Sequence, residues 1–360
     1  MMLVINAGSS SIRYAVFDDQ RAVLAGRFDV GPAGHGAALA QVFAAMEGAG
    51  VPVGRLDAAA HRVVHGGAGL LRTCRIDGAV EAAIAACVPL APLHNPANLA
   101  AIRALAAMVP GLAQYACFDT AFHATNPEVA VRYALPEAER ARGIRRYGFH
   151  GLSYASLVAR LPGMIGGALP KRLLALHLGN GASLCAILEG RSVATTMGYS
   201  PLDGLTMGTR AGGIDGNAVL RLAEVHGVAG AAQILNQQSG LLGLGGSNDM
   251  RELRATEAGR FARAHFAYWV QRHAGSMMAA MGGVDALAFT GGIGENDAEM
   301  RAAVIEGLSW CGVALDSVAN AAGALRIDGG EAVSAWIVAA EEERWIAREA
   351  LAVRATEGLA

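Results

Sequence analysis

The chain has 360 residues, of which 53% are apolar and 17% charged, a balance that fits a compact globular protein and excludes a disordered or fibrous one. Its 29 basic and 31 acidic residues give a net charge of −2. Without a basic surplus, we expect neither a nucleic acid nor an anionic membrane surface as a partner.

The predicted elements alternate between short apolar strands and alanine-rich helices. Strands are expected at residues 2–6, 12–17, 58–64, 114–119, 173–178, 184–188 and 286–290. Helices are expected at residues 37–47, 96–108, 217–226, 257–281, 299–308 and 342–352. The alternation predicts an α/β protein with a mixed or mostly parallel sheet. Asn95 before Pro96 predicts an N-cap followed by the first helical residue.

Two parts of the chain show the same order of elements. Residues 3–17 and 173–188 each read as strand, glycine-containing turn and strand. Residues 56–67 and 284–292 each lead through a strand to paired glycines. This order favours duplication of one α/β unit, and the alternative is chance similarity between strand-turn-strand pieces.

Lysine and cysteine usage limits the enzyme classes and the cellular compartment that we expect for this chain. The chain has 28 arginines and a single lysine, Lys171, whose neighbours exclude a P-loop and a protein-kinase or Schiff-base lysine. Five cysteines without a CxxC pair are typical of a reduced cytosolic protein. The N-terminus lacks a signal-peptide pattern, and prolines break the longest uncharged stretch, residues 82–102, so we expect no membrane span.

Three turns rich in Gly, Ser and Asn are candidate phosphate-binding loops. They lie at residues 6–11, 179–183 and 291–296, where free backbone N–H groups and missing Cβ atoms would let a phosphate approach. Any one alone is more often a simple hairpin. The third is the most specific, because a strand, a glycine turn and an expected Asn296 helix cap follow one another. It is not the dinucleotide fingerprint, since Asp297 replaces the third glycine.

Two arginines are candidates for binding an acidic substrate. On a strand, Arg62 and Val64 would share one face, where a guanidinium could hold a carboxylate and the valine a short alkyl tail. The alternative is a buried strand with a surface arginine. His61 and His65 on the other face are more often packing or hydrogen-bonding residues than a metal pair. Arg210 stands in a loop between glycines, which favours a ligand over an ordinary surface arginine.

Asp119 and His150 are isolated polar residues in apolar surroundings. Such an Asp is as often a structural hydrogen-bonding hub as a catalyst, and such a His is more often structural.

These segments together closely resemble the acetokinase family, within the acetate and sugar kinase, Hsp70 and actin superfamily. The matching blocks include VINAGSSS at 4–11, LAPLHNPANL at 90–99 and FDTAFH at 118–123, and further blocks at 61–67, 147–151, 177–183, 197–210, 239–244 and 289–296. The resemblance implies an α/β fold with two duplicated RNase H-like domains and an interdomain active-site cleft. The N-terminal domain would comprise residues 1–121 plus 344–360, and the nucleotide-binding domain residues 122–343.

The resemblance also implies roles for individual residues. Catalytic roles fall on Arg62, Asp119, His150 and Arg210. The acid would contact Arg62 and an apolar pocket of Val64, Leu93, Phe149 and Pro201. Nucleotide contacts would come from Ser9, Ser11, Arg13, His177, Leu178, Gly179, Asn180, Gly181, Asp249, Met250, Arg251, Gly292, Ile293, Gly294, Glu295 and Asn296. Asn6 and Glu342 would position Mg²⁺ or Mn²⁺.

The activity implied is an acetate kinase: reversible phosphoryl transfer from ATP to acetate, giving acetyl phosphate and ADP, by a cytoplasmic homodimer. The charge of the transferring phosphoryl group would be neutralised by two arginines, a histidine and Mg²⁺, without a P-loop lysine. The alternatives are a propionate or butyrate kinase of the same family, and a catalytically weak nucleotide-binding regulatory homologue. Val64 beside Arg62 favours the smaller acid.

Acetate is already ionised at pH 7, because carboxylic acids have a pKa of roughly 4. Asp119 therefore has no proton to remove, and we expect it to organise metal-bound water or an arginine.

The sequence departs from the family pattern at three places. Arg13 replaces the usual lysine, Gly213 and Gly216 alter the motif after Arg210, and residues 339–341 replace the usual Pro-Thr-Asn. The last change leaves the choice of Glu342 over Glu341 or Glu343 open. The chain is also short for the family, mainly in the segments that connect the blocks.

Overall fold

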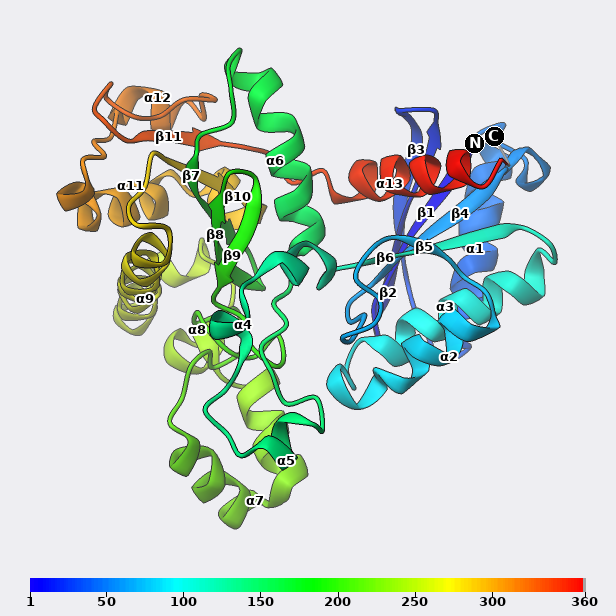
Figure 1. Ribbon diagram of the computed structural model, residues 1–360, viewed down its shortest axis with the longest axis horizontal. Coiled ribbons are helices and arrows are strands. Elements are labelled where there is room, and N and C mark those ends of the chain that lie inside the picture. The colour runs from blue at the N-terminus through cyan, green and yellow to red at the C-terminus, as the bar shows by residue number, and fades with distance from the viewer. Residues whose placement is uncertain (359–360) are drawn as a thin grey trace. The chain divides into compact units, whose positions relative to one another are not determined.

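The computed structural model describes residues 1–358, which separate into two compact units (Figure 1). The first unit contains Met1–Ala124, Gly151–Ser156 and the chain from Glu341 onward, and the second contains Thr125–His150 and Leu157–Ala340. The last two residues of the predicted N-terminal domain, 359 and 360, lie outside the described residues.

The first unit is built on a six-stranded sheet of order β3-β2-β1-β4-β6-β5. Its strands are β1 (Met2–Ala7), β2 (Ser11–Asp18), β3 (Arg21–Asp29), β4 (Ala58–Val63), β5 (Cys74–Arg75) and β6 (Ala113–Phe118). Its helices are α1 (Gly34–Gly48), α2 (Gly78–Ala86), α3 (Asn95–Met108) and α13 (Glu342–Thr356), and the short 3₁₀ turns are η1 (Val53–Arg55), η2 (Val88–Leu90) and η3 (Ala121–Thr125).

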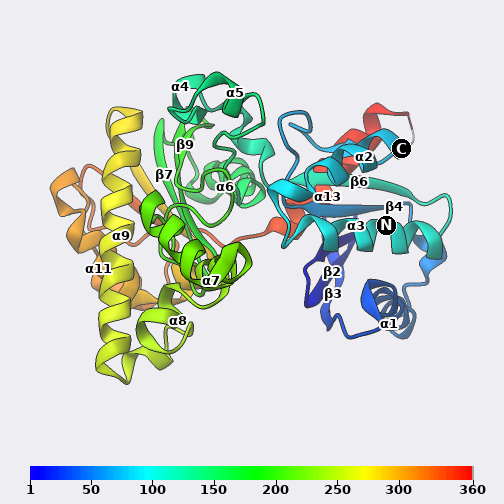
Figure 2. The same cartoon turned by 90° about the horizontal axis from the view of Figure 1, so that it is seen from below.

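Both faces of this sheet are covered by helices (Figure 2). Along β1, Leu3 and Ile5 pack with buried residues of α1 and α3, while Met2 and Val4 pack with α13 on the opposite face. This alternation follows from the two-residue period of a strand. It explains why β1 is apolar at consecutive positions, as strands buried on both faces are.

The second unit has a five-stranded sheet of order β11-β10-β7-β8-β9. Its strands are β7 (Arg172–Leu178), β8 (Ala182–Leu188), β9 (Arg191–Thr195), β10 (Ala286–Thr290) and β11 (Ser334–Ile337). Its helices are α4 (Glu128–Val131), α5 (Glu137–Arg140), α7 (Gly216–Gln237), α8 (Gly240–Gly245), α9 (Glu257–Met281), α10 (Gly291–Asn296), α11 (Ala298–Gly307) and α12 (Ser317–Ala321), with 3₁₀ turns η4 (Glu252–Arg254) and η5 (Ser309–Cys311). Helix α6 (Gly151–Ile165) begins in the first unit and ends in the second.

The two sheets share one topology, which confirms the predicted duplication. In the first, β1 pairs antiparallel with β2 and parallel with β4, and β4 pairs parallel with β6. In the second, β7 pairs antiparallel with β8 and parallel with β10, and β10 pairs parallel with β11. In each unit the first two strands form the hairpin that the repeated sequence pattern predicts.

Helix α7 is the one helix among residues 1–358 that is long and apolar enough to cross a bilayer by length and composition alone. Its course is not continuous, because Gly227 has the non-helical angles φ 71° and ψ 165°. The uncharged stretch 82–102 forms parts of α2 and α3 with η2 between them.

Candidate active site

Three polar side chains lie at one edge of the first unit's sheet. Asn6 belongs to β1, Arg62 to β4, and Asp119 directly follows β6. These strands are parallel neighbours, so their carboxyl ends meet at one edge. The Arg62 guanidinium donates to both Asp119 oxygens, from Nε at 2.9 Å and from Nη2 at 2.6 Å. Its Nη1 donates to Asn6 Oδ1 at 3.3 Å, so one arginine orders the whole group.

Glu342, the first residue of α13, adds a second carboxylate to this group. Burial raises the pKa of Glu342 to about 7; the charge of Arg62 opposes this shift, and the Asp119 carboxylate adds to it. For Arg62, burial favours a lower pKa, but the charges of Asp119 and Glu342 outweigh it and raise the pKa. Glu341 instead pairs with Arg344, with 2.8 Å between Oε2 and Nε. The charges of both Glu342 and Glu343 act on Arg62.

The oxygen atoms of this group suit a magnesium ion. Asn6 offers an amide oxygen, and Asp119 and Glu342 offer carboxylates, which are the hard donors that Mg²⁺ prefers. Burial is the main cause of the raised pKa of Glu342, and the neighbouring carboxylates add to it, so a nearby dication would favour its charged form. No cluster of three or more His, Cys, Asp or Glu side chains in the described residues could hold a metal ion by itself. Mg²⁺ usually keeps several waters and takes one or two carboxylates, so a sparse set fits it.

Asn98, a buried residue of α3 that the sequence pattern did not single out, holds the ends of β1 and β4 together. Its Nδ2 donates to the Ala7 carbonyl at 2.7 Å, and its Oδ1 accepts from the Val64 N–H at 3.1 Å. Ala7 adjoins Asn6, and Val64 lies two residues beyond Arg62. Its partners are 91 and 34 residues away in the sequence, so only a polar side chain within a buried helical stretch could have signalled it.

The N-cap predicted at Asn95 is wrong, because His94 precedes the helix and Asn95 begins it. The Asn95 side chain is fully buried and makes a two-way contact with the backbone of His65, accepting from its N–H at 3.1 Å and donating to its carbonyl at 3.0 Å. A long-range demand for hydrogen bonds therefore overrides the local capping preference.

The strand predicted to carry both Arg62 and Val64 is one residue shorter than expected. Strand β4 ends at Val63, so Val64 starts the following loop, where it is 6% exposed. The neighbouring histidines are hydrogen-bonded core residues, as their more ordinary interpretation predicted. His61 Nε2 lies 2.7 Å from Gln114 Oε1, and His65 Nδ1 accepts from the Gly67 N–H at 2.9 Å.

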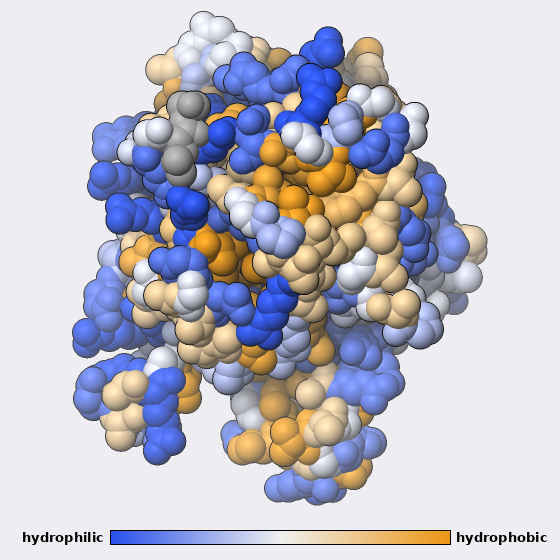
Figure 3. All heavy atoms as spheres, turned by 90° about the vertical axis from the view of Figure 1, so that its right-hand side faces the viewer, coloured by the Kyte–Doolittle hydropathy of each residue, from blue (hydrophilic) through white to orange (hydrophobic). Residues whose placement is uncertain are grey.

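The first hairpin, formed by β1 and β2, carries three predicted nucleotide contacts. Ser9 is exposed, Ser11 is the first residue of β2, and Arg13 projects from β2 with its backbone opposite Asn6. The charge of Arg13 acts to lower the pKa of Glu342, so this arginine lies near the carboxylates at the sheet edge. Figure 3 shows apolar residues, in orange, among hydrophilic residues, in blue, on the face it displays.

In the second unit, His150 and His177 lie face to face. Their ring centroids are 4.1 Å apart with an angle of 21° between the planes. His150 precedes α6 in the left-handed region, at φ 57°, and its Nδ1 lies 2.9 Å from Ser183 Oγ. Such backbone is unfavourable for a residue other than glycine and is often found at functional sites.

Two of the three predicted phosphate loops lie beside these histidines and Arg210. A Cβ atom on Gly181 would lie 3.1 Å from His150 Nε2 and 3.8 Å from Arg210 Nη1. A Cβ on Gly291, whose φ is 77°, would lie 3.2 Å from His177 Nε2. The turn between β7 and β8 and the turn after β10 therefore meet two rings and a guanidinium without intervening side chains. Such glycines let the backbone approach a ligand closely.

Arg263 of α9 links the predicted nucleotide segment 249–251 to the end of the segment 292–296. Its Nη1 donates to the Met250 carbonyl at 2.9 Å and to Asp297 Oδ2 at 2.7 Å. Asp297 is the N-cap of α11 and accepts from the Met300 N–H at 3.0 Å, so the cap predicted at Asn296 is wrong by one residue. This brace fixes residues 249–251 against the end of α10.

Within these segments, three predicted nucleotide contacts are engaged in the fold itself. Asp249 pairs with Arg251, whose hydrogen bonds lower the pKa of Asp249 to about 2. The Glu295 carboxylate accepts from the backbone N–H groups of Gly291, at 3.0 Å, and Ala340, at 2.9 Å. Arg301, missed by the sequence pattern and only 2% exposed, donates to the Glu295 carbonyl at 2.8 Å.

The four apolar residues predicted to receive the acid's alkyl group divide between the units. Val64 and Leu93 belong to the first, where Leu93 is 45% exposed. Phe149 and Pro201 belong to the second, where Phe149 is 1% exposed and the Pro201 carbonyl lies 3.4 Å from Arg210 Nη1.

Comparison with known proteins assigns the chain to a family. The Acetokinase family matches residues 28–348. An acetate kinase from Rhodopseudomonas palustris (strain TIE-1) is 43% identical, over 97% of each chain, and one from Streptomyces coelicolor is 41% identical, over 99% of this chain and 98% of that one. The crystal structure of Porphyromonas gingivalis acetate kinase is 34% identical, with a TM-score of 0.89 over 98% of this chain and 99% of that one. A propionate kinase structure from Francisella tularensis is 33% identical, with a TM-score of 0.92 over 97% and 98%. The chain therefore belongs to the acetokinase family.

Proposed function

We propose that this chain is an ATP-dependent acetate kinase that interconverts acetate and ATP with acetyl phosphate and ADP. The observation that carries the proposal is the Arg62 guanidinium, held in a bidentate ion pair by Asp119 at the strand ends, two residues before the buried Val64. A fixed cation beside a small apolar side chain is the recognition that a short carboxylic acid requires. The full-length similarity to acetate kinases supports the same activity.

The proposed roles of the residues follow their positions. Arg62 would hold the acid carboxylate, and Arg210 the phosphoryl group, with the strained His150 stabilising its charge in the transition state. Nucleotide phosphates would lie on the glycine turns that surround His177. The base and ribose would contact residues 249–251 and 292–296. Leu93, Phe149 and Pro201 would complete the apolar contacts of the acid.

Asn6 and Glu342 would hold Mg²⁺ or Mn²⁺, with Asp119 acting on bound water. When bound, the metal ion would neutralise phosphate charge. Arg62 and Asp119 keep their mutual orientation through their two hydrogen bonds. Asp119 has no proton to remove, because the acceptor carboxylate is already ionised at neutral pH. We therefore assign Asp119 to positioning Arg62 and water rather than to general base catalysis.

The domain boundaries, assembly and location are also proposals. Residues 1–121 with 344–360 would form one domain and residues 122–343 the other. Two copies of the chain would form a homodimer in the cytoplasm, as the family resemblance implies.

The length of the preferred acid is a separate question, since a structural relative is a propionate kinase. The buried Val64 favours acetate, because a branched side chain next to Arg62 leaves less room for an added methylene. One methylene in such a pocket changes binding by about 1–3 kcal/mol, so we expect preference rather than exclusion.

The test is to trap acyl phosphate with hydroxylamine. Purified protein, ATP and Mg²⁺ are incubated with acetate, propionate or butyrate, and the hydroxamate is measured. We expect product from all three acids with the highest kcat/KM for acetate. A higher kcat/KM for propionate would assign the chain to the longer acid. Binding of ATP without any hydroxamate, at high protein concentration, would refute the kinase and favour a regulatory nucleotide-binding protein.

A further inference from the structure

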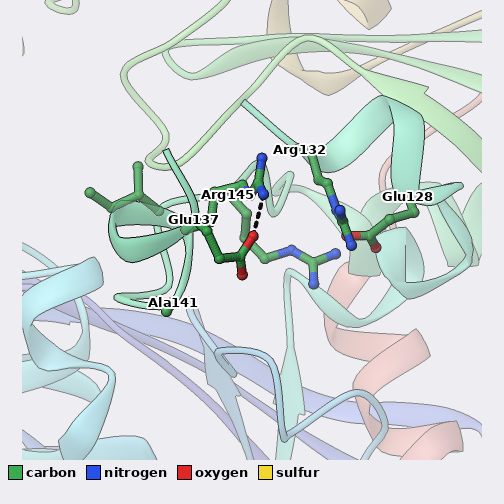
Figure 4. Close-up of a pocket in the computed structure, with 7 residues that line it drawn as sticks. Glu128, Arg132, Glu137, Ala141 and Arg145 are labelled. Carbon is green, nitrogen blue, oxygen red and sulfur yellow. Dashed lines mark hydrogen bonds and ion pairs between the residues drawn. The ribbon is translucent and has the colours of Figure 1, made fainter. Parts of the chain in front are cut away.

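The second unit contains an arginine-lined pocket that none of the proposed roles uses (Figure 4). It has a volume of about 160 Å³ and is lined by three arginines, two glutamates and two apolar side chains. The charged residues are Glu128, Arg132, Glu137, Arg140 and Arg145. We call it the arginine pocket. Three positive and two negative side chains give it an excess of one positive charge.

The backbone places two of these arginines directly opposite each other. Arg132 and Arg145 form an antiparallel β-bridge, and the Arg146 N–H donates to the Val131 carbonyl at 2.8 Å beside it. Like charges on directly opposed residues are unfavourable in an antiparallel pair. A negative group between them would remove this repulsion.

Arg145 is the arginine of the pocket that has a buried N–H donor without an acceptor in the described residues. Its Nε is buried, and no acceptor in the described part of the chain forms a hydrogen bond with it. Its guanidinium carbon lies 5.9 Å from the centre of the Tyr147 ring, which orients the group without neutralising it. In Figure 4 the Arg145 side chain extends between Glu137 and the Arg132–Glu128 pair. A buried donor without an acceptor is unusual in a folded protein and points to a missing partner.

The other two arginines have partners that a ligand could replace. Arg132 pairs with Glu128 and Arg140 with Glu137, and these glutamate side chains are 58% and 77% exposed. The arginines lower the pKa of both carboxyl groups, and the charge of Arg145 contributes at Glu128. Ion pairs as exposed as these contribute little to stability. A ligand with more than one negative charge could therefore compete with the glutamates.

We propose that the arginine pocket binds a small oxyanion with at least two negative charges, carried by a phosphate group or by two carboxylates. The volume of about 160 Å³ is large enough for such an anion, because a cavity can hold a water molecule from about 10–15 Å³ upward. Planar guanidinium groups suit both phosphate and carboxylate, since their paired N–H donors match two oxygens. The inference is independent of the kinase activity, because it uses none of the residues assigned to that reaction.

The test measures anion binding to the full chain by calorimetry, using inorganic phosphate and succinate in parallel. Sodium chloride at equal ionic strength controls for screening. Phosphate could also bind at the kinase site. Binding in the arginine pocket is therefore defined as the component of the signal that Arg145→Gln removes or weakens. We expect this component to weaken about tenfold, because the variant loses a charged hydrogen bond. Tighter binding of phosphate than of succinate identifies the phosphate group as the ligand, and the reverse identifies the dicarboxylate.

A second variant makes the test independent of folding. Glu128→Gln removes a competing negative charge, so it should strengthen binding, whereas a damaged fold would weaken it. Arg103→Gln, which removes an exposed arginine paired with Glu81, is the matched control and should change nothing. Equal anion binding by wild type and Arg145→Gln would overturn the proposal. Weaker binding by Glu128→Gln would also overturn it. A third result would also overturn the proposal: Arg145→Gln changes the oligomeric mass but not the anion binding. Arg145 would then pair with a second copy of the chain.

Discussion

Replacing Asp119 by asparagine separates a positioning role from an acid–base role. The carboxylate accepts from Arg62 Nε and Nη2, and its side chain is only 2% exposed while that of Arg62 is 21% exposed. In Asp119→Asn, one oxygen remains as an acceptor, but the new NH₂ group faces a guanidinium that can only donate. Arg62 therefore loses half of its bidentate contact and its main countercharge.

The size of the effect follows from this burial. Breaking one side of a buried ion pair costs about 3–5 kcal/mol, and the partial exposure of Arg62 places the cost near the lower end. If about 3 kcal/mol of positioning energy is lost in the transition state, kcat/KM for acetate falls about a hundredfold. Glu342 should change as well. Because the Asp119 charge helps raise the pKa of Glu342, that pKa should fall below its present value of about 7.

The assay is the initial rate of hydroxamate formation over a matrix of acetate and Mg²⁺ concentrations. We expect Asp119→Asn to raise KM for acetate and to weaken the Mg²⁺ dependence together. Asp328→Asn is the matched control, because Asp328 also holds an arginine, Arg326, through two bonds of 2.9 Å, in the second unit. A variant with normal Mg²⁺ affinity and normal KM for acetate, but without turnover, would refute the positioning role. Asp119 would then act on a proton.

Three further predictions concern the same sheet edge. Val64→Ala should raise the ratio of kcat/KM for propionate to kcat/KM for acetate by about tenfold, because it makes room for one methylene. An unchanged ratio would show that Val64 does not face the acid. Asn98→Ala should lower the free energy of unfolding in urea by about 2–6 kcal/mol, because two buried backbone groups lose their hydrogen-bond partner. It should also raise KM for acetate. The control Asn236→Ala, on α7, should change neither quantity. Burial lowers the pKa of His61 to about 4. The unfolded chain therefore binds more protons between pH 6.5 and 4, so stability is complete above about pH 6.5 and declines toward pH 4. His61→Gln should flatten this decline, and an equal pH slope in both proteins would contradict a neutral buried His61.

The predicted elements were most accurate where a strand is fully buried or a helix buries one face along its whole length. Strand β10 and helix α9 have the predicted bounds, and β1 extends one residue further than expected. Several elements were missed, among them the 15-residue helix α6, and others have no clear period. Strand β3 is an edge strand with an exposed, irregular pattern, and α8 and α10 are short glycine-rich helices. Their conformation depends on neighbours that a local pattern does not contain.

For the candidate active site, the sequence supplied the candidate residues, and the family resemblance supplied the roles expected of them. The glycine turns, Arg62, Asp119, His150 and Arg210 were recognisable because glycine and isolated charged residues within apolar runs carry local signals. The repeated order of strand and turn was also enough to indicate duplication, since sheet topology follows from strand order and the rules of connection.

Only the tertiary structure decided how these groups are held. It paired Arg62 with Asp119, placed Glu342 near them, and made Asn98 the link between two strand ends. It also left the buried Nε of Arg145 without an acceptor in the described chain. The reason is physical: a buried polar group must find its partner wherever the fold brings one, and these partners lie tens to hundreds of residues apart in the sequence.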